Sequence, residues 1–230
     1  MKDSRLKVLA RIGRQIRAGV APPGAAVEHP GSLPLSPGDA DRASAIARFT
    51  REYEALTGTV HRARDEAAAV AVTLDLLRSL GAGRVLAWDD QRLGVPALGP
   101  ALREAGVVVE SCWLPPASEE RAARLQALDA VPVGLTGALA GVADTGSLVV
   151  VSGPGQGRIA SLLPPVHVAV LHASSILPSL AHVFAAYPNA IEEGSNLVVI
   201  TGPSRTADIE MTLTRGVHGP GEVHAVIVGD

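Results

Sequence analysis

The stretch that decides the fold is RVLAWDDQRLGVPALGPALREAGVVVESCWLPPASEERAARLQALDAVPVG, residues 84–134. It contains three short apolar runs, at its start, at 107–109 and at 130–134. Segments with helical spacing, 96–105 and 118–128, lie between these runs. Strands that alternate with helices in this order are typical of a mostly parallel sheet with covered faces. We therefore expect an α/β fold with helices on both faces of the sheet.

Further apolar runs follow this stretch. Residues 147–151, 166–171 and 196–201 are continuous and rich in β-branched side chains, as fully buried strands are, and 224–228 is a candidate last strand. We predict at least five strands, in a parallel-rich sheet, between residues 84 and 230.

The region before residue 84 has a different pattern. Residues 40–56 and 63–80 have helical apolar spacing, and Gly81 suits the carboxyl-terminal cap of the second helix. We expect residues 40–80 to pack as helices against the sheet. Residues 1–39 combine a short basic amphipathic helix with a loop rich in Pro and Gly. The predicted organisation is therefore an N-terminal segment, 1–39, and a domain, 40–230.

Composition excludes several classes of protein. With 47% hydrophobic and 19% charged residues, the 230-residue chain can form a packed core. Its net charge of −3 gives no broad attraction to nucleic acid or to an anionic membrane. The N-terminus lacks the apolar core of a signal peptide, so we expect a cytoplasmic protein.

Cys112 is the only cysteine. This chain alone can therefore form neither an intrachain disulfide nor a cysteine-ligated iron–sulfur cluster. The histidines show none of the spacings of a metal site, so we expect no bound metal and no cofactor held by this chain alone.

The segment after the run at 196–201 is the strongest candidate site. Gly202 begins a turn that we predict to lead into a helix reaching Glu210. Backbone N–H groups at a helix start, the hydroxyls of Ser204 and Thr206, and the planar fork of Arg205 together suit an anion. A second interpretation stays open, in which Thr206 only caps the helix and Glu210 interacts with its dipole.

Two glycine-containing turns are further candidates. Thr145 and Gly146 lie in a turn of small residues that a ligand could approach closely; the alternative, a simple turn without a ligand, stays open. Arg158 follows the glycine-rich segment 152–157, and its guanidinium could meet a carboxylate or a phosphate. That segment has neither the Lys-Ser or Lys-Thr of a Walker A loop nor the spacing of a dinucleotide loop, and a flexible loop is the alternative.

Histidines are the candidate proton carriers. His218, which lies among glycines and a proline, could act as a general acid or base, or could simply be a turn residue. His167 and His172 lie on a core strand, where a histidine is more often a hydrogen-bonded core residue than a ligand. We predict that the loop residues converge on one pocket at the carboxyl ends of strands: Thr145, Arg158, Ser204, Arg205 and His218.

Four blocks of the sequence together resemble the signature blocks of the LUD (lactate utilization) domain family. They are residues 143–149, Arg158 with residues 162–168, residues 200–210 and residues 216–220, and the resemblance is closest over residues 84–230. It implies a three-layer α/β/α fold of the NagB/RpiA/CoA-transferase-like type.

The resemblance also implies a function. It is to the cluster-free C component of a system that oxidises L-lactate to pyruvate, in which a partner subunit carries the iron–sulfur clusters. The expected partners are those subunits and a small carboxylate or phosphate ligand, with no nucleic acid and no membrane. His218 and Glu210 are the candidate catalytic residues. Two alternatives stay open: a stand-alone enzyme acting on an acyl-CoA, a folate or a sugar phosphate, with Glu193 or Glu210 as nucleophile or base, and a scaffold with a vestigial pocket.

Overall fold

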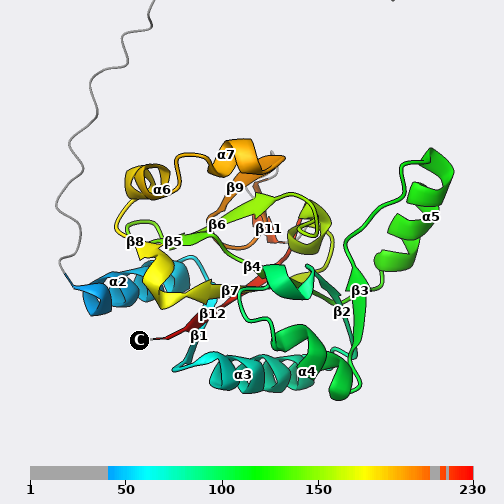
Figure 1. Ribbon diagram of the computed structural model, residues 1–230, viewed down its shortest axis with the longest axis horizontal. Helices are drawn as coiled ribbons and strands as arrows, with labels where there is room; N and C mark the ends of the chain where they lie inside the picture. The colour runs from blue at the N-terminus through cyan, green and yellow to red at the C-terminus, as the bar shows by residue number, and fades with distance from the viewer. Residues whose placement is uncertain (1–40, 208–212, 216–217, 230) are drawn as a thin grey trace, which may run out of the picture. The chain divides into compact units, whose positions relative to one another are not determined.

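A six-stranded parallel sheet forms the centre of the computed structural model, which describes residues 41–207, 213–215 and 218–229 (Figure 1). The strand order is β1-β12-β7-β4-β2-β3, and every pairing is parallel. The strands are β1 (Thr59–Ala63), β2 (Arg84–Ala87), β3 (Val108–Ser111), β4 (Val133–Gly137), β7 (Val166–His172) and β12 (Glu222–Val228).

A second sheet lies beside the first and has the order β8-β5-β6-β9. In it, β6 pairs antiparallel with both β5 and β9. Its strands are β5 (Ala140–Val142), β6 (Ser147–Ser152), β8 (Ile176–Leu177) and β9 (Asn196–Ile200). A separate antiparallel pair consists of β10 (Arg205–Ala207) and β11 (Leu213–Arg215).

Helices cover the central sheet on both faces. In Figure 1, α3 and α4 lie along one face, and α2 lies on the other face together with the second sheet, which α6 and α7 cover from outside. The α-helices are α2 (Arg42–Ala55), α3 (Glu66–Ser79), α4 (Leu98–Glu104), α5 (Ser118–Leu128), α6 (Leu180–Ala186) and α7 (Ala190–Glu193). Short 3-10 turns are η1 (Asp90–Arg92), η2 (Arg158–Ser161) and η3 (Ala173–Ser175). The predicted three-layer α/β/α fold with a mostly parallel sheet is confirmed.

Local sequence explains where the long helices begin. Asp65 caps α3 by accepting a hydrogen bond from the Ala68 amide at 2.7 Å, and Asp41 caps α2 in the same manner. Phe49 and Tyr53 of α2 are fully buried, with ring centroids 5.4 Å apart. These two rings anchor α2 on the core.

Three structural predictions were wrong. The first is that residues 40–80 pack as helices alone. The two predicted helical segments, 40–56 and 63–80, form α2 and α3, but β1 lies between them. Its sequence, TVHRA, is short and half polar, so it carries no clear strand signal by itself. Pairing with β12, a strand from the opposite end of the chain, is what stabilises β1 as an edge strand.

The second concerns the runs at 147–151 and 196–201, which are not part of the central sheet. They form β6 and β9 of the second sheet. The turn ending at Gly146 reverses the chain directly between β5 and β6, and such a short reversal can join only antiparallel strands. Five strands nevertheless lie in the central sheet between residues 84 and 230, as predicted.

The third is the helix after Gly202, because Arg205–Ala207 form strand β10 instead. Pairing with β11 engages its backbone groups, so Arg205–Ala207 provide no helix start for an anion. In the part of the chain described, no helix is both long and apolar enough to cross a membrane.

The packing of η2 on β4 gives a stability prediction. A Cβ at Gly134 would overlap the Ala160 carbonyl oxygen of η2 and would lie 3.2 Å from Pro164. We expect Gly134→Ala to lower the free energy of unfolding by about 1–3 kcal/mol, as overpacking of a core does. Gly83→Ala is the matched control, because no heavy atom lies within 4 Å of a Cβ there. Urea unfolding would measure both, and equal midpoints for the two variants would contradict the prediction.

Candidate functional site

A small pocket lies between the two sheets, at the amino ends of β7 and β12, and has a volume of about 220 Å³. Three segments far apart in the sequence form it: the start of β7, the turn after β9 and the turn before β12. The polar side chains that line it are those of Ser161, His167, Thr201, Ser204 and His218.

Backbone hydrogen bonds tie these segments together. The Ser204 amide donates to the Pro220 carbonyl at 2.8 Å, and the Gly221 amide donates to the Pro165 carbonyl at 2.9 Å. A Cβ at Gly219 would lie 3.4 Å from the Ser204 Cβ, an ordinary van der Waals distance, so the two turns lie side by side. Ser204 and the turn that carries His218 are therefore held against the start of β7.

His167 is the most informative residue of the pocket. It is 1% exposed, and its Nε2 forms a hydrogen bond with Thr136 Oγ1 at 2.9 Å. Its Nδ1 is buried and has no hydrogen-bond partner among the described residues. Burial, reinforced by the nearby His224, lowers the pKa of His167 from 6.5 to about 4, so the ring is neutral at pH 7.

The direction of the Thr136 hydrogen bond decides what Nδ1 can do. If the Thr136 hydroxyl donates, Nδ1 carries the proton and is an unused donor. If Nε2 donates, Nδ1 is an unused acceptor. In both cases a ligand in the pocket could satisfy a buried polar atom that otherwise destabilises the fold.

Thr145 and Gly146 lie behind the pocket rather than in it. Thr145 Oγ1 pairs with Ser147 Oγ at 2.8 Å, and Ser147 Oγ pairs with Thr201 Oγ1 at 2.9 Å. Gly146 has a φ of +59° and packs against the backbone of α2 at Tyr53, where a side chain would not fit. The turn thus orients Thr201, which lines the pocket.

The other predicted residues lie elsewhere. Arg205 is absent from the lining, and its guanidinium donates to the Leu56 carbonyl at the end of α2. Arg158 lines a different pocket, whereas Ser161, at the other end of η2, lines this one. The side chain of Thr206 and all of Glu210 lie outside the described residues.

Gly202 turns the chain after β9. It lines the pocket, has a φ of +80°, and packs against Leu56. Of the five loop residues expected to converge, the structure thus brings Ser204 and His218 into one pocket and connects Thr145 to it through two hydrogen bonds.

The place of the pocket in the central sheet differs from the expectation. The turn after β9 follows the carboxyl end of a strand, as predicted, but β9 belongs to the second sheet. Because that sheet folds back over the central one, this turn reaches the amino ends of β7 and β12. The pocket therefore lies at the opposite end of the central sheet from the one we expected.

Sequence reasoning missed His167 as a site residue. A histidine in an apolar run resembles a core residue, and His167 is indeed fully buried. The available signal was its position directly after Pro164-Pro165-Val166, at the start of the run, where a side chain can face a pocket at the sheet edge.

The lining favours binding through hydrogen bonds over covalent catalysis. It offers a neutral imidazole, hydroxyl groups and the exposed His218, and the lining residues that the structure describes include no carboxylate or thiol. Cys112 is buried elsewhere and donates to the Ala87 carbonyl, and burial raises the pKa of its thiol to about 12. No group of three or more metal-ligating side chains occurs in the residues described.

Comparison with known proteins gives a consistent picture. The model of the LUD domain family matches residues 46–228. Lactate utilization protein C of Geobacillus sp. (strain WCH70) is 34% identical over 157 residues, which are 65% of this chain and 64% of that protein. The chain thus matches slightly less than two thirds of that relative's length.

Two further relatives carry the same description. Lactate utilization protein C of Shouchella clausii is 30% identical over 80% of this chain and 76% of that protein, and the Exiguobacterium sp. protein is 36% identical over 72% and 70%. A crystal structure of a DUF162 family protein from Deinococcus radiodurans aligns with a TM-score of 0.57 at 23% identity, covering 82% of this chain and 99% of that one. That likeness concerns the fold alone.

The lowered pKa of His167 predicts how stability depends on pH. Between pH 6.5 and about 4 the unfolded state binds a proton at this histidine and the native state does not, so stability falls as pH falls through this window. The total loss is about 3 kcal/mol, since each pKa unit corresponds to about 1.4 kcal/mol. We expect His167→Gln to lose correspondingly less free energy of unfolding between pH 7 and pH 4 than the wild type, as measured by urea titrations. Parallel losses in the two proteins would contradict this assignment.

Proposed function

Because the chain belongs to the LUD domain family, we propose that it is a cluster-free component of a bacterial lactate-utilization system and binds a small 2-hydroxy or 2-oxo carboxylate in the His167 pocket. The observation that carries the proposal is the unpartnered Nδ1 of a neutral, buried histidine in a small pocket that Ser204 and His218 also line. The descriptions of the relatives name lactate utilization and so support lactate as the ligand, with pyruvate as its 2-oxo counterpart.

The size and chemistry of the pocket agree with such a ligand. Its volume of about 220 Å³ is below that of cavities for drug-sized molecules, which begin at about 300 Å³. The Ser204 hydroxyl can donate to a carboxylate, and His167 Nδ1 can pair with the 2-hydroxyl or 2-oxo oxygen. A neutral imidazole provides that contact without burying another charge.

His218 is the proposed proton carrier. Oxidation of L-lactate to pyruvate releases two electrons and two protons, and an exposed histidine beside the ligand can transfer a proton to solvent. Arg205 is a positioning residue in this proposal, because its bond to the Leu56 carbonyl holds the turn from Gly202 to Ser204 against α2.

The electrons require a partner. One buried cysteine cannot hold an iron–sulfur cluster, so we propose that the clusters belong to partner subunits. Two apolar side chains of the pocket, Leu162 and Val199, are 47% and 37% exposed. We place the contact with a partner there, because exposed apolar groups beside a site suit a protein interface.

The ligand can be tested by calorimetric titration with L-lactate and pyruvate. We expect Ser204→Ala to weaken binding about tenfold to hundredfold, because a hydrogen bond to a charged group contributes about 1.5–3 kcal/mol. Ser118→Ala is the matched control, since Ser118 is exposed on α5 and caps nothing. Equal affinities of these two variants, or no binding of either acid by the wild type together with its partner subunits, would refute the proposal.

A further inference from the structure

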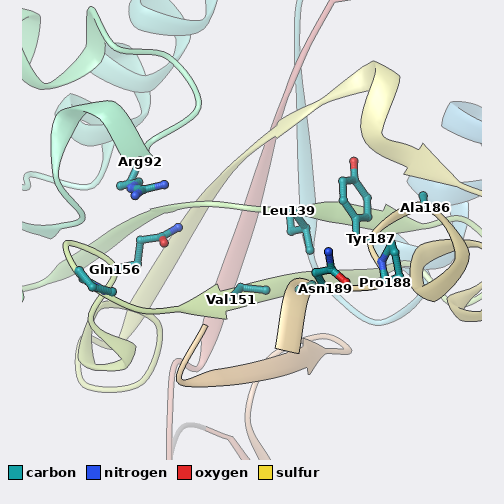
Figure 2. A pocket seen from close by; sticks show the side chains of 10 residues that line it. Arg92, Leu139, Val151, Gln156, Ala186, Tyr187, Pro188 and Asn189 are labelled. Carbon is teal, nitrogen blue, oxygen red and sulfur yellow. The ribbon is translucent and has the colours of Figure 1, made fainter. Parts of the chain in front are cut away.

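A second, larger cavity of about 470 Å³ lies at the other end of the central sheet (Figure 2). Arg92, which ends the η1 turn after β2, and Leu139, which follows β4, both line it. The segment after β6 and the link between α6 and α7 complete it. This cavity is distinct from the His167 pocket and shares no lining residue with it.

The topology of the sheet explains why a cavity opens here. Strands β2 and β4 are neighbours, but the chain leaves β2 toward β3 on one side and leaves β4 toward β7 on the other. After β4 the chain passes through β5 and β6 of the second sheet before it reaches β7, so the connections separate at the carboxyl ends of β2 and β4. In open α/β sheets this switch of direction leaves the crevice in which ligands bind.

The wall beside Arg92 is held by hydrogen bonds. The Asp89 amide donates to the Gly155 carbonyl at 2.9 Å, and Trp88 Nε1 donates to the Gly157 carbonyl at 3.1 Å. Gly153 and Gln156 exchange backbone hydrogen bonds at 3.2 and 2.9 Å. The glycine-rich segment 152–157, for which a flexible loop was the alternative in the sequence, is therefore a fixed turn against the end of β2.

Arg92 is available to an anion. Its guanidinium forms no hydrogen bond or ion pair within the described residues, and it is the only charged residue among the described lining residues. The neighbouring Asp90 carboxylate already forms an ion pair with Arg103 of α4. Figure 2 shows Gln156 beside Arg92, so a guanidinium and a side-chain amide share one end of the cavity.

The opposite end of the cavity is lined by aliphatic, aromatic and amide side chains. Figure 2 shows Leu139, Tyr187 and Asn189 gathered there, at a distance from Arg92. Asn189 occupies the N-cap position of α7, yet its side chain forms no cap hydrogen bond. Among the residues that the structure describes its amide group has no hydrogen-bond partner, so it can pair with a ligand beside an aliphatic and an aromatic surface.

We propose that this cavity binds a phosphorylated nucleoside. The phosphate pairs with Arg92 and Gln156, and the base lies between Leu139 and Tyr187 with its edge toward the Asn189 amide. A guanidinium suits phosphate geometry, and an amide offers the donor and acceptor that a base edge requires. Lactate would fill only a small part of about 470 Å³, so the ligand class differs from that of the His167 pocket.

Calorimetric titration of the full chain with AMP, adenosine and ribose 5-phosphate tests the assignment. We expect AMP to bind more tightly than either fragment. Arg92→Gln should weaken AMP binding about tenfold or more, because it removes a charge-assisted hydrogen bond. Gln156→Glu should weaken it as well, since the new carboxylate repels the phosphate. Both variants should retain the wild-type affinity for adenosine.

Arg62→Gln is the matched control, because Arg62 is exposed on β1 and belongs to neither pocket. Equal AMP affinities of Arg92→Gln and Arg62→Gln would overturn the proposal, and so would a wild-type protein that binds AMP no better than adenosine or binds neither. L-Lactate is titrated into the same variants. Retained lactate binding by Arg92→Gln separates failure at this cavity from failure at the His167 pocket.

Discussion

The parallel pairing of β12 with β7 is the interaction on which the rest of the structure depends. It runs in register from Glu222 opposite Val166 to Val228 opposite His172 and buries nearly every side chain of both strands. β12 is the last described strand, and this pairing places it inside the sheet, next to strands from much earlier in the chain. It also provides the edge on which β1 forms and fixes the turn before β12 against the start of β7.

The two ends of the central sheet differ because different loops reach them. The second sheet folds back and brings the turn after β9 to the amino ends of β7 and β12, where a buried imidazole is left with one nitrogen unpaired. At the carboxyl ends of β2 and β4 the connections separate, and a larger cavity opens, lined by the Arg92 guanidinium, which has no partner among the described residues. One sheet thus carries a small pocket lined by hydroxyl groups and a buried imidazole, and a large one lined by a guanidinium.

Part of the small site was visible in the sequence. Ser204 and His218 stood out because a hydroxyl and a histidine among glycines and prolines are typical of ligand-binding turns. His167 was concealed by its apolar neighbours, and its unpaired Nδ1 depends on Thr136, a residue 31 positions away that occupies the other nitrogen. Arg205 had the right chemistry for an anion, yet its guanidinium donates to the carbonyl of Leu56, a residue 149 positions away in the chain.

The sequence by itself determined the fold class, the central strands after residue 84 and the long helices, because their signals are local: alternating apolar runs, helical spacing and capping residues such as Asp65. Only the tertiary structure decided which sheet each apolar run joined, that β1 and β10 are strands, and which loops meet at each end of the sheet. The sequences of β6 and β9 resemble those of central strands, and nothing in them indicates which strands they pair with. Pairing is set by contacts between residues far apart in the chain, and those contacts exist only once the chain has folded.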